Sequence, residues 1–193
     1  MLTKNFVTLY KALALRAGTG DANYINLKKK SGKTEQTMDK AIEGIRTFPS
    51  TTAMVPPERT SSCVLALGTG TREASIDDYD MEAEITEGLE ILSQVTAYTT
   101  DLAGEFATIT RVVKNTTDQP IAINEVGVFA RGFENSWNND TGVFLIAREK
   151  LKKQRVIPGG GQTTVHYHFV HRIGGLMHSI VATFGNRLGV VAC

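Results

Sequence analysis

The chain has 193 residues, of which 41% are hydrophobic and 21% are charged, a composition that is ordinary for a globular protein with a buried core. Its 21 Lys and Arg residues nearly balance its 20 Asp and Glu residues, so net charge gives no reason to expect a nucleic acid or an anionic membrane as partner. No apolar run reaches the roughly 18 residues of a membrane span and no signal peptide is evident, so we expect a soluble protein made in a cytoplasm.

Residues 1–62 are predicted to form an N-terminal helix followed by a long extended arm. Within residues 3–16, the apolar side chains Phe6, Leu9 and Leu13 recur at the spacing of one helix face. We take these three as candidate interface residues that anchor the chain on a neighbouring subunit. The rest of the segment is polar, contains three consecutive lysines and ends in a proline pair, which favours an arm that orders against a partner.

Residues 63–193 are predicted to form an antiparallel β-sandwich core with a C-terminal tail, so the fold class is mainly β. Short β-type segments recur about every dozen residues between turn signals, as is typical of sandwiches. The strongest prediction is an antiparallel hairpin, in which EFATITRVVKN (105–115) and IAINEVGVFAR (121–131) are joined by an Asn- and Pro-containing turn. Further strands are predicted in CVLAL, LSQVTAYTT, GVFLIARE and QTTVHYHFVHRI.

The stretch LALGTGTREASIDDYDM (65–81) raises the question of a phosphate-binding loop. A dinucleotide fingerprint requires a third glycine three residues after the second, and Glu73 stands at that position, where it would repel a pyrophosphate. The following residues do not favour a helix, so the positive helix terminus that holds phosphate is missing. We therefore predict a turn followed by an acidic, solvated loop over residues 77–84. The tetrapeptide SGKT (31–34) also fails as a phosphate loop, because Leu27 replaces the first glycine of that pattern.

The histidines are the only other arrangement that suggests chemistry. His166 and His168 are separated by one residue, which places them on one face of a predicted strand at a spacing suited to a metal pair. No cysteine lies near them, and the nearest carboxylate in the sequence is Glu149. A polar outer face of a half-buried strand is the simpler interpretation. We predict no metal, no cofactor and no catalytic residues.

Glu125 stands out because it lies within an otherwise apolar predicted strand. A buried carboxylate must find hydrogen bonds or a cation. Arg111, Arg131 and Arg148, each on a predicted strand, are the candidate partners. We predict a structural salt bridge rather than a catalytic acid.

Several motifs taken together resemble those of virion structural proteins of tailed bacteriophages, a diffuse group found in tail, neck and baseplate regions. They are GTGT followed by acidic residues (68–78), the segment that contains INEVGVFAR (105–131), FLIARE (144–149) and VIPGGGQTTVHYHF (156–169). The resemblance covers roughly residues 64–170, and its most specific part is NEVGVFAR. It implies an assembly role and brings no catalytic residues with it.

We therefore expect a non-enzymatic structural subunit of a tailed-phage virion, which is assembled in the host bacterial cytoplasm as an oligomeric ring or layer at the neck, collar, tail or baseplate. Its partners are expected to be copies of itself and other virion structural proteins, with no nucleic-acid specificity and no membrane. Cys193 is a further candidate interface residue, because a terminal cysteine can cross-link to a neighbouring subunit, whereas Cys63 is predicted to be a buried thiol.

Three alternatives stay open at this point. A head decoration or minor capsid protein needs the same sequence features. A carbohydrate-binding module of a fibre or baseplate would use Trp137, Tyr98 and Tyr167 as stacking platforms. A metal-dependent hydrolase that uses the histidines is the enzymatic alternative.

Overall fold

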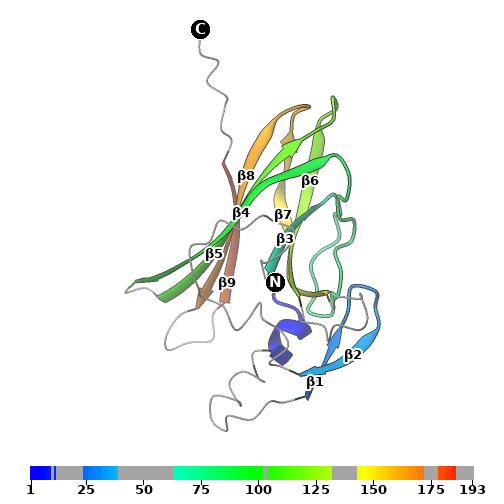
Figure 1. Cartoon of the computed structure of the whole chain (residues 1–193), viewed down its shortest axis with the longest axis vertical. Helices are drawn as coiled ribbons and strands as arrows, with labels where there is room; N and C mark the ends of the chain where they lie inside the picture. Colours follow the sequence, from blue (N-terminus) through cyan, green and yellow to red (C-terminus); the bar gives the residue numbers. More distant parts are fainter. Residues whose placement is uncertain are drawn as a thin grey trace. The chain divides into compact units, whose positions relative to one another are not determined.

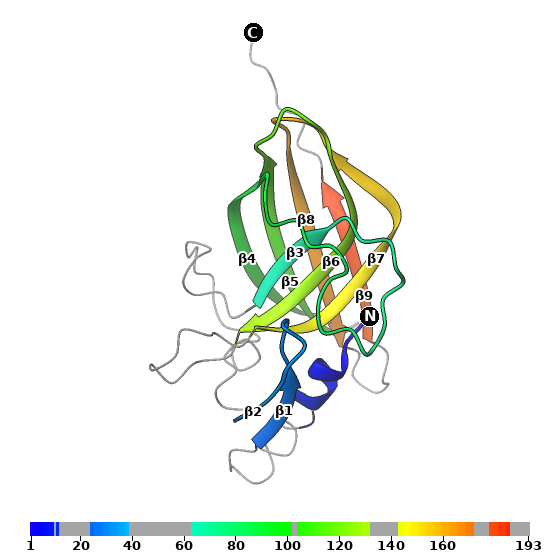
Figure 2. The same cartoon turned by 90° about the vertical axis from the view of Figure 1, so that its right-hand side faces the viewer.

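The computed structural model describes residues 1–9, 11, 24–38, 63–101, 104–131, 143–171 and 178–185. In these ranges residues 4–9 are helical, and almost all the remaining regular structure is β-strand (Figures 1 and 2). The strands are β1 (Tyr24–Lys28), β2 (Thr34–Met38), β3 (Cys63–Gly68), β4 (Leu89–Asp101), β5 (Gly104–Asn115), β6 (Ile121–Arg131), β7 (Val143–Ile157), β8 (Gln162–His171) and β9 (His178–Gly185).

The strands form three sheets, with the orders β1-β2, β3-β6-β7 and β4-β5-β8-β9. Antiparallel pairing joins β1 to β2 and β3 to β6. It also joins β4 to β5, β5 to β8 and β8 to β9. The predicted fold class, mainly β with antiparallel sheets of the kind that build sandwiches and a short N-terminal helix, is confirmed. The predicted boundary between residues 62 and 63 adjoins residues outside the described ranges and stays a prediction.

The chain divides into two compact units that alternate along the sequence. Unit 1 contains residues 1–48, 61–84 and 124–152, and therefore β1, β2, β3 and most of β6 and β7. Unit 2 contains residues 49–60, 85–123 and 153–193, and therefore β4, β5, β8 and β9.

The predicted hairpin of residues 105–115 and 121–131 is wrong. β5 pairs with β4 and β8, whereas β6 lies between β3 and β7, so these two consecutive strands belong to different sheets. The residues between them form a corner that Asn115 holds, because its side-chain amide donates to the carbonyls of Gln119 (2.7 Å) and Ile157 (3.0 Å). The actual hairpin joins β4 to β5 through a two-residue connection, in which Asp101 faces Gly104.

Alternation along the strands buries one face of the four-stranded sheet, whereas the strands of the three-stranded sheet carry runs of consecutive buried residues. In unit 2 the buried apolar positions include Ile109 and Val113 on β5 and Val165 and Tyr167 on β8. In unit 1, Val143 packs against a buried cluster whose members come from β3, β6, β7 and the loop after β3: Ala66, Met81, Phe129 and Leu145. Full burial of one such side chain contributes about 1.5–3 kcal/mol, so these rows are the main source of stability.

The segment predicted as an extended arm contains a hairpin. β1 and β2 pair from Tyr24 with Met38 to Lys28 with Thr34, and the turn between them has Gly32 at φ 82°. Leu27 is fully buried, so the hairpin contributes an apolar side chain to the core of unit 1. The parts of the predicted arm before residue 24 and after residue 38 lie outside the described residues.

Candidate functional site

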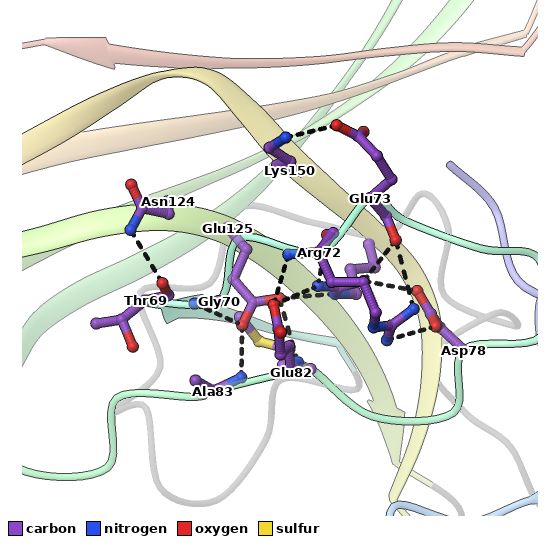
Figure 3. A network of polar contacts seen from close by, with 12 residues as sticks. Thr69, Gly70, Arg72, Glu73, Asp78, Glu82, Ala83, Asn124, Glu125 and Lys150 are labelled. Atoms are coloured by element: carbon purple, nitrogen blue, oxygen red, sulfur yellow. Dashed lines mark hydrogen bonds and ion pairs between the residues drawn. The ribbon is translucent and has the colours of Figure 1, made fainter.

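The most extensive polar cluster in the described residues surrounds Glu125 on β6 (Figure 3), which pairs with Arg148 on β7. Both side chains are 0% exposed, because each continues a run of buried apolar residues along its strand. The Nε–H group of Arg148 donates to Glu125 Oε2 at 2.6 Å. The predicted salt bridge of Glu125 is confirmed, and Arg148 is its partner. Another candidate, Arg111, instead donates to Gln94 Oε1 at 2.9 Å.

Arg148 also pairs with Asp78, from the loop that follows β3. Its Nη1 donates to Asp78 Oδ2 at 2.8 Å, and Arg72 Nη2 donates to Asp78 Oδ1 at the same distance. Asp78 therefore bridges two guanidinium groups. The predicted solvated loop is wrong at this residue, because Asp78 is buried, whereas its neighbour Asp77 is exposed.

These contacts shift the pKa values of the paired groups. Burial by itself raises the pKa of Asp78, but the hydrogen bond from the Ser75 N–H group and the two guanidinium groups outweigh burial, so the pKa is lowered. Burial likewise opposes the charge of Arg148, yet hydrogen bonds to Asp78 and Glu125 raise its pKa. The cluster is therefore ionised at neutral pH at both of these positions.

The carboxylate of Glu125 is also surrounded by backbone donors. Its Oε1 accepts hydrogen bonds from the N–H groups of Ala83 (2.7 Å) and Gly70 (3.2 Å), and its Oε2 accepts one from Glu82 N–H (3.3 Å). Together with Arg148, these donors occupy the acceptor sites of both oxygens. The geometry holds the loop of residues 69–84 against β6, and it leaves no free lone pair for a substrate.

The two glycines of GTGT are explained by this close approach of the loop to Glu125. A Cβ atom at Gly68 would lie 2.6 Å from Glu125 Oε1 and 2.6 Å from the carbonyl oxygen of Ala83. A Cβ atom at Gly70 would collide with the side chains of Glu125 and Glu82. Glycine is required at both positions because the backbone passes directly over the carboxylate. The stretch does surround an anion, but that anion is the protein's own Glu125.

Exposed ion pairs lie around the buried cluster. Lys150 Nζ lies 2.5 Å from Glu73 Oε1, and the backbone N–H group of Arg72 donates to Glu82 Oε2 at 2.6 Å. This hydrogen bond is the main reason that the pKa of Glu82 is lowered. Exposed pairs contribute between zero and about 1 kcal/mol each. The buried contacts therefore dominate the energetics of the cluster.

The β1–β2 hairpin contributes two lysines to the outer side of the same loop. Lys28 Nζ lies 3.8 Å from the centroid of the Tyr79 ring, and Lys30 forms an ion pair with Glu84. Lys30 Nζ also lies 5.1 Å from the centroid of the Phe129 ring. Cation–π contacts at exposed positions contribute about 0.5–1 kcal/mol. The hairpin therefore helps to hold the loop in place.

The histidine pair does not have the geometry of a metal site. The rings of His166 and His168 are stacked, with centroids 6.3 Å apart and planes inclined by 21°. Zinc requires each ligating nitrogen at about 2.1 Å, and near-parallel rings at this separation do not converge on one ion. Each Nδ1 instead lies 3.0 Å from a threonine hydroxyl, of Thr110 and Thr108 respectively. Across the described ranges, no group of three or more His, Cys, Asp or Glu residues is arranged to hold a metal.

The predicted interface residues are only partly described. Phe6 is half-buried, and Leu9 is almost completely buried within the chain itself, so Leu9 packs in the core of unit 1 in this structure. The two others, Leu13 and Cys193, lie outside the described residues. The structure therefore does not bring the four together.

Of the three aromatic residues expected to stack on a carbohydrate, only Tyr167 has a described side chain. It is 0% exposed, so it cannot serve as a platform for a sugar ring and that prediction is wrong. Trp137 and the side chain of Tyr98 lie outside the described residues.

Comparison with protein-family models, with curated proteins and with solved structures gives no match to this sequence. Among the described residues, no helix is long and apolar enough to cross a membrane.

Proposed function

We propose that the protein is a non-enzymatic structural subunit of a tailed-phage virion, which forms an oligomeric ring or layer at the neck, collar, tail or baseplate. The observation that carries this proposal is that three separate motifs contribute to one buried cluster. Gly68 and Gly70 come from GTGT, Glu125 comes from NEVGVFAR and Arg148 comes from FLIARE. These are the motifs that carry the resemblance to virion structural proteins.

The chemistry of the cluster supports a structural role for these motifs. A catalytic acid or base needs a proton or a lone pair that can reach the substrate. Glu125 is fully enclosed, and its oxygens accept hydrogen bonds from three backbone N–H groups and from Arg148. The pairing of Glu125 with Arg148 therefore favours a structural role, in which it fixes the loop of residues 69–84 on the sheet.

Open sheet edges give the subunit a way to assemble. Among the described strands, β4 and β9 are the edges of one sheet, and β3 and β7 are the edges of another, where residues 1–3 pair with β7 at residues 146–148 and leave the later part of that edge open. Edge strands present unpaired backbone groups that readily join another chain. In a virion subunit such edges serve assembly.

The mass of the purified protein in solution tests the proposal. Native mass spectrometry and sedimentation velocity over a wide range of protein concentration should show one closed oligomer, with a mass that is an integer multiple of the chain mass. A monomer under every condition of salt and concentration would contradict an assembly role. Labelling of the protein in intact particles would then separate the neck, tail or baseplate from the head, where a decoration protein lies.

A further inference from the structure

Exposed apolar side chains lie on two strands at sheet edges, two neighbours on one strand and a single residue on the other. Ile91 and Leu92 on β4 are 37% and 42% exposed, and Val156 on β7 is 51% exposed. Each of the two strands is the last of its sheet among the described strands. Exposed apolar groups on open edges mark places where another chain can bind.

A β-bulge explains the exposure on β4. Ile91 faces Val113 on β5 and Ser93 faces Val112, so Leu92 is an extra residue without a facing residue on β5. A bulge of this kind redirects side chains and bends the strand. It leaves two consecutive apolar side chains exposed near the beginning of β4.

The exposed pair Ile91 and Leu92 on β4 and the single exposed Val156 on β7 have charges of opposite sign beside them. Glu87 and Glu90 are exposed next to the patch on β4. Lys152 and Lys153 are exposed next to Val156, and residues 152–156 are exposed throughout although they belong to a strand. We call Glu87, Glu90, Ile91 and Leu92 the acidic edge, and Lys152, Lys153 and Val156 the basic edge.

Contacts within unit 2 hold the start of β4 near the end of β7. Leu89, at the start of β4, faces Asn115 at the end of β5. The side chain of Asn115 donates to the carbonyl of Ile157, the last residue of β7, and to the carbonyl of Pro158. Two different surfaces of one subunit can pair head to tail between copies, which closes a ring when the rotation is suitable.

We propose that the acidic edge of one copy binds the basic edge of the next copy. This contact rests on the proposed function, because it specifies how the subunits of the ring meet. When the segments are aligned antiparallel with Glu90 opposite Lys152, Ile91 stands opposite Leu151 and Glu87 stands opposite Arg155. Two pairs of opposite charge and one apolar pair then coincide, while Leu92 stands opposite Lys150, Leu89 opposite Lys153 and Val156 opposite Thr86.

Lysines on an edge strand otherwise discourage pairing. A partner edge that carries carboxylates removes this charge repulsion, whereas a partner edge that carries lysines retains it. Electrostatic complementarity of this kind selects the correct partner and fixes the register. The basic edge is therefore specific for the acidic edge and disfavours pairing with itself.

Charge reversal of each edge tests this contact on the full chain. Lys152→Glu/Lys153→Glu makes both edges acidic, and Glu87→Lys/Glu90→Lys makes both edges basic. Each variant alone should associate about tenfold or more weakly than the wild type in sedimentation velocity, since like charges then face each other. An equimolar mixture should regain the oligomer, because every reversed edge finds an oppositely charged one. Lys33→Glu, at an exposed lysine in the β1–β2 turn, is the matched control and should assemble normally.

The outcomes separate this inference from the proposed function. If both reversal variants assemble as the wild type does, or if the mixture stays dissociated, the proposed contact is wrong while the ring itself stands. A monomeric wild type contradicts the proposed function, and the contact is then wrong with it. Circular dichroism confirms the fold of each variant, and Leu92→Ser, which keeps every charge, should also weaken association.

Discussion

Replacement of Arg148 with methionine is expected to lower the free energy of unfolding by about 3–5 kcal/mol, the range for removal of one partner of a buried ion pair. Methionine keeps much of the apolar stem but removes the enclosed cation that pairs with Glu125 and Asp78. It also removes a donor to the carbonyl of Arg72, which lies 3.1 Å from Arg148 Nη2.

The structure places the expected loss near the lower end of that range. Glu125 keeps its three backbone donors in the variant, and Asp78 keeps its bonds from Arg72 and Ser75. Solvent does not screen the pair in the wild type, because both side chains are fully enclosed. In a protein of 150–250 residues, 1 kcal/mol corresponds to about 2–4 °C in Tm, so a loss of about 3 kcal/mol lowers Tm by about 6–12 °C.

Equilibrium unfolding in urea, followed by far-UV circular dichroism at a fixed protein concentration, measures this loss. Lys150→Met is the matched control, because Lys150 lies two residues further along β7 and forms a mostly exposed pair with Glu73. The Lys150→Met variant should lose less than about 1 kcal/mol of the free energy of unfolding. Glu125→Gln combined with Arg148→Met should lose less than the sum of the two single variants, since the two side chains interact directly.

Equal, small losses in Arg148→Met and Lys150→Met would refute the reasoning. They would mean that the Arg148 guanidinium is solvated rather than enclosed. Additive losses in the Glu125→Gln and Arg148→Met pair would likewise contradict a direct contact between these side chains.

Three further predictions concern the loop and the corner. Gly70→Ala should lower the free energy of unfolding in urea by about 1–3 kcal/mol, because the added methyl group collides with Glu125. The control Thr69→Ala, at an exposed side chain, should leave it nearly unchanged. Equal effects of the two substitutions would contradict the close approach of the loop to Glu125. The pKa of Asp78 is lower in the folded protein than in the unfolded chain, so the unfolded chain binds the proton more readily. The stabilisation that ionised Asp78 gives to the folded state is therefore complete above about pH 4, and it is lost as the pH falls through the folded-state pKa. Asp78→Asn should therefore flatten the acid limb of the urea midpoint measured against pH, and an unchanged limb would contradict the pairing. Asn115→Ala should lower the free energy of unfolding by about 1–3 kcal/mol, because the carbonyls of Gln119 and Ile157 lose their donor. The control Lys114→Ala, at an exposed side chain, should have little effect. A neutral Asn115→Ala would contradict the role of this side chain in holding residues 116–120.

The strand composition of the sequence was enough to predict a mainly β fold, but strand pairing was not. The predicted hairpin of 105–115 with 121–131 failed because Asn, Asp and Pro are typical of tight turns and of corners between sheets alike. What decides between them is where the Asn115 side chain finds its acceptors, and one of these is the carbonyl of Ile157, distant in sequence. No local pattern contains that information.

The buried cluster could be predicted in part. Glu125 in an apolar strand required a cation, and Arg148, which continues the apolar run FLIA, was one of three candidates. Asp78 was missed because it lies among exposed acidic residues, and only the three-dimensional path of the loop distinguishes it from Asp77. The paired glycines were the available signal, since glycines flanking an acidic loop indicate a close backbone approach.

The measurement that tests the account most directly is the copy number and position of this protein in intact, purified phage particles. Quantitative mass spectrometry of the particles and labelling by electron microscopy give both quantities. The account predicts a fixed copy number that equals the subunit count of the oligomer in solution, at one station of the neck, collar, tail or baseplate. Absence of the protein from particles, with all of it free in the host cytoplasm, would contradict the proposed structural role.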